Sequence, residues 1–499
     1  MSLLETLVLG SYFFVLVLLG LYGWHRYYLV YAYHKNKDRV PGPPPAWEGP
    51  LPPVTIQLPL YNEMYVVDRL LQAAARIDYP RDLLEIQVLD DSTDETTEVA
   101  RRGAERLVEQ GFDVKLLHRT NRAGFKAGAL DAGLKVARGE FVAIFDADFV
   151  PSPDFLLKTV PYFQDPAVAM VQARWGHVNA DYSTLTRVQA VLLDAHFVLE
   201  HGSRNRSGHF FNFNGTAGIW RRSVIPAAGG WQHDTLTEDL DLSYRAQLLG
   251  WKFLFLPDLV APAEVPVEMN AFKSQQHRWA KGSIQVCLKL LPRILQSDQP
   301  FGVKAEAFLH LTANFNYLLM TALSVLMFPS MIIRYNMGWY EMLLIDVPLF
   351  VAATASVVNF YLVSQRELYP DWKARLRYVP ALMAVGIGLA VNNTRAVVEA
   401  LARHQSAFAR TPKYGVERGS DQWVGKKYMQ ATAWQPLVET GLGLYFTATV
   451  LYALANGIYG SLPFLMLFQG GFLYMGLMSF IQQFGGAQAV LNAQVARGK

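Results

Sequence analysis

Apolar runs at both ends of the chain set the first constraint on its fold. A helix needs roughly 20 apolar residues to cross a bilayer. Five runs of this 499-residue chain reach that length: 3–24, 305–333, 342–363, 436–456 and 462–481. The region between the first two is as rich in charge as a soluble enzyme. We therefore predict an integral, multi-pass membrane protein with one large polar domain.

The first run is expected to remain as an anchor, residues 1–24. No basic region precedes it and no small-residue cleavage site follows it, unlike in a signal peptide. Arg26, Lys35, Lys37 and Arg39 come directly after it. Because positive charge collects on the cytoplasmic side of a membrane, the polar domain is predicted to be cytoplasmic. Residues 25–53 read as a basic and proline-rich linker, extended rather than folded.

The membrane region, 304–499, contains one segment of a different kind. Residues 380–403 begin apolar but turn polar at NNTR. A full crossing would move the basic stretch after it to the outside, against the charge rule. We therefore interpret 380–403 as interfacial or re-entrant and the loop 404–432 as cytoplasmic. Residues 284–303 have one apolar face, which fits an interfacial helix, or a helix that covers the enzyme's own core.

Strands and helices alternate in the polar domain, 54–283. Short apolar runs at 54–58, 85–89, 114–117 and 141–145 are separated by helical patterns at 64–75, 95–110 and 126–136. This alternation predicts an α/β fold with an open, mostly parallel sheet and helices on both faces. Ligands bind such sheets outside the carboxyl ends of the strands.

Carboxylates follow two of these strands. Asp146 and Asp148 come after 141–145, and a pair spaced in this way can hold a hard divalent cation that also binds phosphate oxygens. Asp90 and Asp91 follow 85–89 and could bind the edges of a nucleoside. Each pattern has a simpler explanation, since DDSTD could cap the next helix and a lone D-x-D is common by chance. Their occurrence on one sheet favours a binding site.

Three further patterns are candidates for the same site. TLTEDLD brings Glu238, Asp239 and Asp241 to the start of a helix, where acids also complement the helix dipole. A general base must be ionised beside its acceptor, and one of these acids could serve. NGT, 214–216, lies in a glycine-spaced turn that could let the backbone approach a sugar. SQQHRWAKGS, 274–283, offers a planar guanidinium for phosphate and an indole face for a sugar ring.

Seven motifs together resemble those of membrane-embedded, inverting family 2 glycosyltransferases. They are PLYNE (59–63), DDSTD (90–94), KAGAL (126–130), DAD (146–148), NGTAG (214–218), TED (237–239) and QQHRW (275–279). The chain is similar to a cellulose synthase-like enzyme, of the type that makes mannan, glucomannan or xyloglucan-type backbones. The resemblance implies a GT-A type fold with the nucleotide-sugar site at the strand carboxyl ends, plus α-helical membrane segments.

The resemblance also implies roles for residues. Asp239, with Glu238 beside it, is expected to be catalytic as the general base, and Asp146 and Asp148 are expected to hold Mg²⁺ or Mn²⁺. The nucleotide sugar is expected to bind Pro59, Tyr61, Glu63, Asp90, Asp91, Lys126, Gly128 and Asp146. The acceptor and diphosphate are expected to bind Gln275, Arg278, Trp279, Asn214, Gly215 and Thr216. FARTPK resembles the gating-loop pattern F-x-V-T-x-K, with Phe408, Thr411 and Lys413 in register and Arg410 in place of valine.

The function expected from this resemblance is transfer of a hexose from UDP-glucose or GDP-mannose to a growing β-linked polysaccharide, with inversion. A lipid glycosyltransferase of the ceramide-glucosyltransferase kind shares the D-x-D and Q-x-x-R-W patterns and is the alternative. The expected partners are the nucleotide-sugar donor, a polysaccharide or lipid acceptor and the bilayer, with no nucleic acid. Charges inside the apolar runs are few, which argues against an ion-relay transporter.

Overall fold

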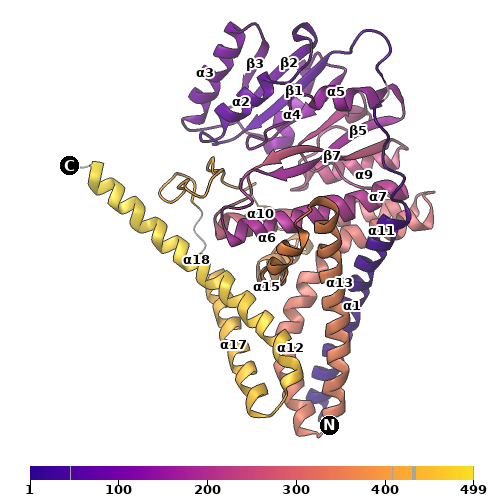
Figure 1. The fold of residues 1–499 in the computed structure, drawn as a ribbon, viewed down its shortest axis with the longest axis vertical. Helices are drawn as coiled ribbons and strands as arrows, with labels where there is room; N and C mark the ends of the chain where they lie inside the picture. The colour runs from indigo at the N-terminus through magenta and orange to yellow at the C-terminus, as the bar shows by residue number, and fades with distance from the viewer. Residues whose placement is uncertain (45, 407, 430–433, 498–499) are drawn as a thin grey trace.

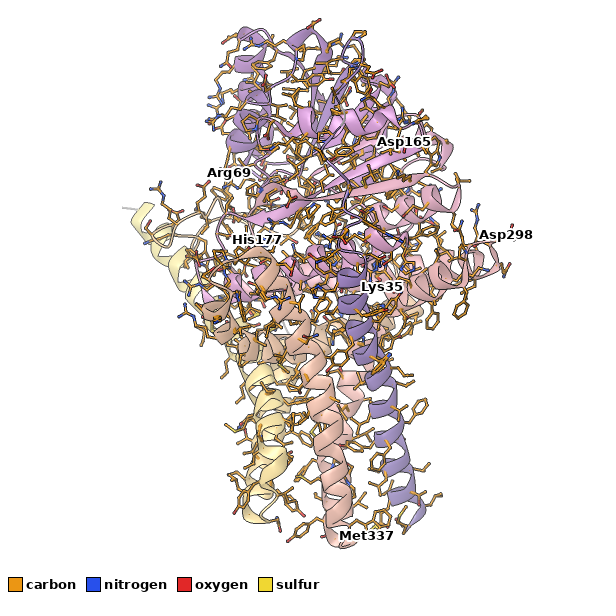
Figure 2. The ribbon with its side chains drawn as sticks, turned by 45° about the vertical axis from the view of Figure 1, so that its right-hand side comes forward. Lys35, Arg69, Asp165, His177, Asp298 and Met337 are labelled. Atoms are coloured by element: carbon orange, nitrogen blue, oxygen red, sulfur yellow. The ribbon has the colours of Figure 1, made fainter. Side chains whose placement is uncertain are left out.

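A sheet domain stands on a bundle of long helices in the computed structural model (Figure 1). The structure describes residues 1–44, 46–406, 408–429 and 434–497, and side chains throughout these ranges except in 340–349 and 485–497. Figure 2 shows His177 near the junction of the two parts and Met337 at the far end of the bundle. The junction is therefore the place where a site in the domain can meet the membrane helices.

The sheet is mostly parallel, as predicted, and has seven strands in the described part of the chain. Its order is β3-β2-β1-β4-β6-β5-β7. Strands β3, β2, β1 and β4 run parallel to one another, β6 runs antiparallel between β4 and β5, and β7 pairs parallel with β5. The strands are β1 Val54–Leu60, β2 Leu84–Asp90, β3 Asp113–His118, β4 Phe141–Ile144, β5 Val168–His177, β6 Gly218–Arg221 and β7 Lys252–Ala263.

Helices cover both faces of this sheet, and two apolar clusters result. Leu70 of α2 and Leu107 of α3 belong to the cluster on one face. Leu130 of α4 and Leu242 of α9 belong to the cluster on the other. The helices of the domain are α2 Val67–Ala75, α3 Thr96–Glu109, α4 Phe125–Val136, α5 Phe155–Thr159, α6 Thr184–Ala195, α7 Gly202–Ser207, α8 Val224–Ala227 and α9 Glu238–Leu248, with a π-helical turn at His196–His201.

Four described helices are long and apolar enough to cross a membrane, or five if a bent pair counts as one span. The chain is accordingly a multi-pass membrane protein. The four are α1 Leu3–Lys35, α12 Phe315–Asn336, α17 Gln435–Ala455 and the segment Tyr459–Phe484, which includes most of α18 Leu462–Arg497. The predicted run 342–363 lies in one helix, α13 Tyr340–Leu368, part of whose side chains fall outside the described residues.

Two predicted boundaries differ from the structure. The first helix continues to Lys35, eleven residues beyond the predicted anchor, because its buried positions continue through Leu29 and Tyr33 where it meets the domain. The predicted run 305–333 is two helices, α11 Phe301–Thr312 and α12. The break falls at 313–314, where α11 packs against α10 of the domain rather than continuing into the bundle.

Residues 284–303 are not a separate helix. They begin inside α10, Met269–Gln296, and end in α11. Ile284, Cys287 and Ile294 are buried against protein, whereas Leu288 and Leu295 are 47% and 46% exposed. Burial of the first three is what a helix that covers the core of the sheet domain requires.

The segment 380–403 forms the bent pair α15 Val379–Gly388 and α16 Ala390–Leu401, which follow the short helix α14 Trp372–Arg375. The two halves of this pair meet at 40°. The polar half, α16, packs on α10, as Ile284 and Val397 share a cluster. The chain then returns to the sheet domain through the loop 404–432, of which residues 407 and 430–432 lie outside the described part.

Candidate active site

One cleft brings most of the predicted site residues together. It opens at the carboxyl ends of β1 and β4 and beside the start of α9, and its void volume is about 1200 Å³ including the part open to solvent. Its lining includes these predicted residues: Pro59, Tyr61, Glu63, Asp91, Lys126, Asp146, Asp148, Asn214, Gly215, Glu238, Asp239, Gln275, Arg278, Trp279, Phe408, Thr411 and Lys413. Asp90, Gly128 and Thr216 are the predicted residues that do not line it.

The carboxylate pair after β4 is held by two ammonium groups. Lys126 Nζ lies 2.5 Å from Asp146 Oδ1, and Lys413 Nζ lies 2.7 Å from Asp148 Oδ2. Burial opposes the charge of Lys126, but the carboxylates around it, Asp146 first, outweigh burial and raise its pKa. Among the described residues, the second oxygen of each aspartate accepts no hydrogen bond. The pair therefore presents free carboxylate oxygens on one wall of the cleft.

The two aspartates after β2 have different surroundings. Asp91 receives two hydrogen bonds from the Arg119 guanidinium, at 2.7 and 2.5 Å, and lines the cleft. Asp90 is fully buried, accepts the Ser92 amide at 2.9 Å and lies 2.8 Å from His118 Nδ1. Asp90 therefore organises the turn after β2 and does not line the cleft.

Gly128 and Thr216 also act from behind the cleft. A Cβ at Gly128 would lie 2.0 Å from the Ala123 carbonyl oxygen, so this glycine lets the loop 119–124 pack on α4. Thr216 is fully buried, and its hydroxyl accepts the Asp146 amide at 2.9 Å. Both residues therefore support the cleft from behind. Gly128 supports the loop that carries Arg122, and Thr216 supports the strand end that carries Asp146.

Asp239 lies directly against the glycine turn. Gly215 has φ +79°, and a Cβ there would lie 3.0 Å from Asp239 Oδ2. The Gly215 carbonyl accepts a hydrogen bond from Lys126 at 2.9 Å. Burial and the neighbouring Glu238 raise the pKa of Asp239 to about 7. Burial likewise raises the pKa of Glu238. A carboxyl group with a pKa near neutrality is suited to take a proton and release it again.

The QQHRW segment lies in α10 and faces the cleft with three side chains. Gln275, Arg278 and Trp279 line it, and the Trp279 ring lies 6.5 Å from that of Trp175. Arg278 donates to the Ala409 carbonyl at 2.9 Å. Burial lowers the pKa of Arg278, and the carboxylates around it oppose that effect. The α10 wall of the cleft therefore presents the guanidinium of Arg278 and the indole of Trp279. A second indole, that of Trp175, lies beside Trp279.

Two further basic side chains of residues 274–283 point away from the cleft. His277 and Lys281 lie 3.3 and 2.9 Å from Glu399 of α16. Lys281 is fully buried and also donates to the Ser406 hydroxyl at 2.9 Å. These contacts join α10 to the bent pair, so the segment combines site residues on one face with a helix contact on the other.

The loop after α16 closes one side of the cleft. Phe408, Arg410, Thr411 and Lys413 line it, and Phe408 stacks on Phe125 with 5.8 Å between ring centroids. Glu264, at the end of β7, accepts the backbone amides of residues 414, 415 and 416 at 2.8, 2.9 and 3.2 Å. This carboxylate fastens the loop to the sheet domain next to Lys413.

Several cleft residues were not predicted from sequence. Arg122 stacks over Tyr61 at 3.3 Å, and Arg410 lies 3.4 Å from Glu63. Burial raises the pKa of Glu63 to about 7, although Arg410 opposes this rise. Trp175 and His177 reach the cleft from the end of β5. That end carries no carboxylate, but the rule that ligands collect at strand ends could have singled it out.

The cleft supplies some, but not all, of the oxygen ligands that a divalent cation would need. No cluster of three or more His, Cys, Asp or Glu that could hold a metal occurs among the residues described. The free oxygens of Asp146 and Asp148 are hard ligands of the kind that Mg²⁺ and Mn²⁺ prefer when phosphate oxygens complete the site. The pair therefore fits a cation that arrives with a diphosphate.

Comparison with known proteins identifies the sheet domain. The family described as "Glycosyltransferase like family 2" matches residues 52–282. Residues 52–282 are a family 2 glycosyltransferase domain. This domain has the GT-A type fold, and the mannosyltransferase PcManGT from Pyrobaculum calidifontis shares that fold. The two align with a TM-score of 0.50 at 22% identity, over 81% of this chain and 100% of that one.

Curated relatives of the glycosyltransferase domain include plant enzymes. Glucomannan 4-beta-mannosyltransferase 2 of Arabidopsis thaliana is 45% identical over 253 residues, which are 50% of this chain and 47% of that protein. Glucomannan 4-beta-mannosyltransferase 1 of Oryza sativa subsp. japonica is 45% identical over 50% of this chain and 49% of that protein. The chain thus spans about half the length of these relatives. Probable glucomannan 4-beta-mannosyltransferase 15 of A. thaliana matches at 36% identity over 68% of this chain and 66% of its own length.

Proposed function

We propose that this protein transfers a hexose from a nucleotide sugar to a growing β-linked polysaccharide at the membrane, with inversion at the anomeric carbon. The observation that carries the proposal is one cleft that contains both the carboxylate pair Asp146 and Asp148 and the buried acid Asp239. Mannose from GDP-mannose is the first donor to test, because the curated relatives named above are glucomannan mannosyltransferases. UDP-glucose is the second.

The donor would bind along the strand ends. Asp91 would contact the nucleoside, and Tyr61, stacked under Arg122, offers a flat face beside it. The diphosphate would lie near Lys126 and Arg278, whose positive charges can neutralise the charge of the leaving group. Asp146 and Asp148 would hold Mg²⁺ or Mn²⁺, which stabilises negative charge on the diphosphate when bound. PcManGT is described in complex with GDP-Man and Mn²⁺.

The transfer step needs one base and no covalent intermediate. The Asp239 carboxylate takes the proton of an acceptor hydroxyl while that oxygen attacks the anomeric carbon. The bond from this carbon to the phosphate oxygen breaks, and the nucleoside diphosphate leaves with the electron pair. Attack opposite to the leaving group inverts the anomeric centre, which gives a β-linkage from an α-linked donor. Trp279 and Gln275 would hold the terminal acceptor sugar.

The loop 404–432 would act as a gate over the bound donor, through Phe408, Thr411 and Lys413. Its position is consistent with that role, since Lys413 contacts the Asp148 carboxylate. The loop and the glycosyltransferase domain would both be cytoplasmic, as the basic residues after the first apolar run favour.

Product analysis tests this proposal and separates polymer from lipid. Membranes containing the protein are incubated with labelled GDP-mannose or UDP-glucose and Mg²⁺ or Mn²⁺, with EDTA in a parallel reaction. We expect metal-dependent label in a product that resists lipid extraction and is released by a β-1,4-linkage-specific hydrolase. Label found only in the lipid extract would instead support the ceramide-glucosyltransferase type. No labelled product with either donor would contradict the proposal.

A further inference from the structure

A π-helical turn lies behind the glycine turn of the cleft. It covers His196–His201, directly after α6. Insertions of this kind are rare in helices and shift the side chains that follow. Here the turn brings His196 against Asn214, the residue before the glycine that abuts Asp239. None of the proposed donor, metal or base contacts involves the residues of this turn.

In the side-chain amide of Asn214, the nitrogen has a hydrogen-bond partner and the oxygen has none among the described residues. Its Nδ2 lies 3.0 Å from His196 Nε2, and its backbone amide donates to Gln172 Oε1 at 3.1 Å. Its side-chain oxygen is buried and accepts no hydrogen bond from any described residue. A buried acceptor without a hydrogen bond destabilises the structure around it. A hydroxyl group of a ligand in the cleft would satisfy it, since Asn214 is part of the cleft lining.

The orientation of this amide follows from the state of His196. Its Nδ1 lies 2.7 Å from Glu200 Oε2. Burial opposes ionisation of Glu200, but the hydrogen bond from His196 and the charge of Arg204 outweigh burial and lower its pKa. A carboxylate can only accept, so Nδ1 carries the ring hydrogen. The Asn214 NH₂ group can only donate, so Nε2, which lies 3.0 Å from it, is the acceptor.

Glu200 is in turn linked to two buried charged residues. Arg204 lies 3.7 Å from Glu200 and donates to Glu306 of α11 at 2.9 Å. Glu306 also lies 2.9 Å from His25 Nε2 of α1. Both Arg204 and Glu306 are nearly inaccessible to solvent. The Glu200 carboxylate thus lies between two basic side chains, with His196 at 2.7 Å and Arg204 at 3.7 Å.

We propose that His196, held by Glu200, is a positioning residue that orients the Asn214 amide so that its oxygen accepts a hydroxyl group of the acceptor sugar. This inference rests on the proposed function. The imidazole does not contact the reacting atoms in this arrangement. It prevents the amide from rotating, because rotation would bring the amide oxygen against the Nε2 lone pair.

Two substitutions separate the hydrogen bond from packing. His196→Phe keeps a ring of similar size but has no acceptor, so the amide loses its fixed orientation. His196→Gln restores an acceptor oxygen on a flexible side chain. Tyr244→Phe is the matched control, since it removes another buried hydrogen bond, from the Tyr244 hydroxyl to His310 at 2.7 Å, outside the cleft lining.

The experiment uses the full chain in detergent or nanodiscs with GDP-mannose, metal and an added β-1,4-linked manno-oligosaccharide. For His196→Phe we expect transfer at sub-saturating acceptor to fall on the order of tenfold, the effect of one lost hydrogen bond. The dissociation constant for GDP should change less than twofold. His196→Gln should recover most of the transfer, and Tyr244→Phe should resemble the unaltered protein.

Three results would overturn the inference. One is transfer by His196→Phe within twofold of the unaltered protein. Another is equal loss of transfer and of GDP binding in both His196 variants, which would indicate a structural role. The third is an equal loss of transfer in Tyr244→Phe. Absence of transfer by the unaltered protein would contradict the proposed function itself, and the inference would fall with it.

Discussion

Two adjacent acids at the start of α9 determine how the proposed reaction depends on pH. The pKa of Asp239 is raised to about 7 by burial first and by the charge of Glu238 second. A base must be unprotonated, so transfer should fall as the pH drops through about 7. Glu238→Gln removes the second cause. We therefore expect the acid limb of the kcat/KM profile to move to lower pH in this variant. A limb that stays in place or moves to higher pH would contradict the assignment.

The role of Gly215 beside Asp239 can be tested by substitution, with Gly208, which also has a positive φ, as the control. Gly215→Ala requires an L-residue at φ +79° and puts Cβ 3.0 Å from Asp239 Oδ2. Gly208→Ala has a similar strain, at φ +71°, but meets nothing within 4 Å. Displacement of a reacting group by about 1 Å can reduce a rate about 100-fold. We expect a loss of this order in transfer for Gly215→Ala and less than threefold for Gly208→Ala, measured at saturating donor.

The family resemblance, together with the carboxylates at the strand ends, singled out most of the residues that line the cleft but could not assign neighbouring residues. Asp90 and Asp91 look equivalent in DDSTD, yet one is paired with His118 behind the cleft and the other lines it. The side chain of a strand's last residue and that of the next residue point in different directions, and only the turn geometry decides which faces the ligand. Arg122, whose φ is +41°, was missed for the same reason.

At the scale of elements, the loop 404–432 is fastened by contacts between segments far apart in sequence. Tyr414, Val416 and Trp423 form a buried cluster with Val267. Gly415 has φ +65°, and a Cβ there would lie 2.8 Å from the Tyr65 carbonyl oxygen. No side chain fits this place without moving the loop.

Gly415→Ala should therefore release the loop. We expect a cost to loop docking of about 1–3 kcal/mol, from the strained backbone and the close contact. Limited proteolysis should cleave the loop faster, and transfer should decrease. Gly419→Ala is the matched control, because its Cβ would meet nothing within 4 Å and its φ is not in the strained region. Equal cleavage rates in the two variants would mean that the loop is not held at Gly415.

Helix boundaries were predicted less well than helix type. Hydropathy predicted one span at 305–333. The chain turns at 313–314 instead, and of the two helices α11 and α12 it is α12 that qualifies as a candidate span. The apolar residues of α11 serve a protein contact instead, with Val303, Ala307 and Leu311 buried against α10. Burial in protein and burial in lipid select the same residue types, so composition does not distinguish them.

At the scale of the whole molecule, one buried ion pair joins the domain to the membrane helices. Lys273 of α10 donates to Glu439 of α17 and to the Ser479 hydroxyl of α18 at 2.7 Å. Both charged residues are almost fully buried. Removal of one partner leaves an uncompensated buried charge, which costs about 3–5 kcal/mol.

We expect Lys273→Met and Glu439→Leu each to lower the midpoint temperature of unfolding in detergent. The double variant Lys273→Met with Glu439→Leu should recover much of this loss, because it leaves neither charge buried. Losses that simply add in the double variant would show that the two side chains do not depend on each other.

The overall architecture was predictable because it depends on averages over many residues. Alternating apolar runs predicted the mostly parallel sheet, and the motifs predicted its GT-A type fold. The junction was not predictable from Glu306 and Glu439, because a charge within an apolar run does not identify its partner. Their partners, Arg204 and Lys273, are more than 100 residues away.

The central claim is that Asp239 is the base of a glycosyl transfer in this cleft. Asp239→Asn keeps the shape of the side chain but cannot take the proton. Purified protein is assayed with labelled GDP-mannose, UDP-glucose and Mn²⁺, and nucleotide binding is measured on the same samples. Asp234→Asn, at an exposed acid outside the cleft lining, is the control.

We predict that Asp239→Asn transfers no detectable sugar with the donor that the unaltered protein uses. Its dissociation constant for the nucleotide should remain within about threefold of the unaltered value, and Asp234→Asn should retain full transfer. Robust transfer by Asp239→Asn would contradict the account.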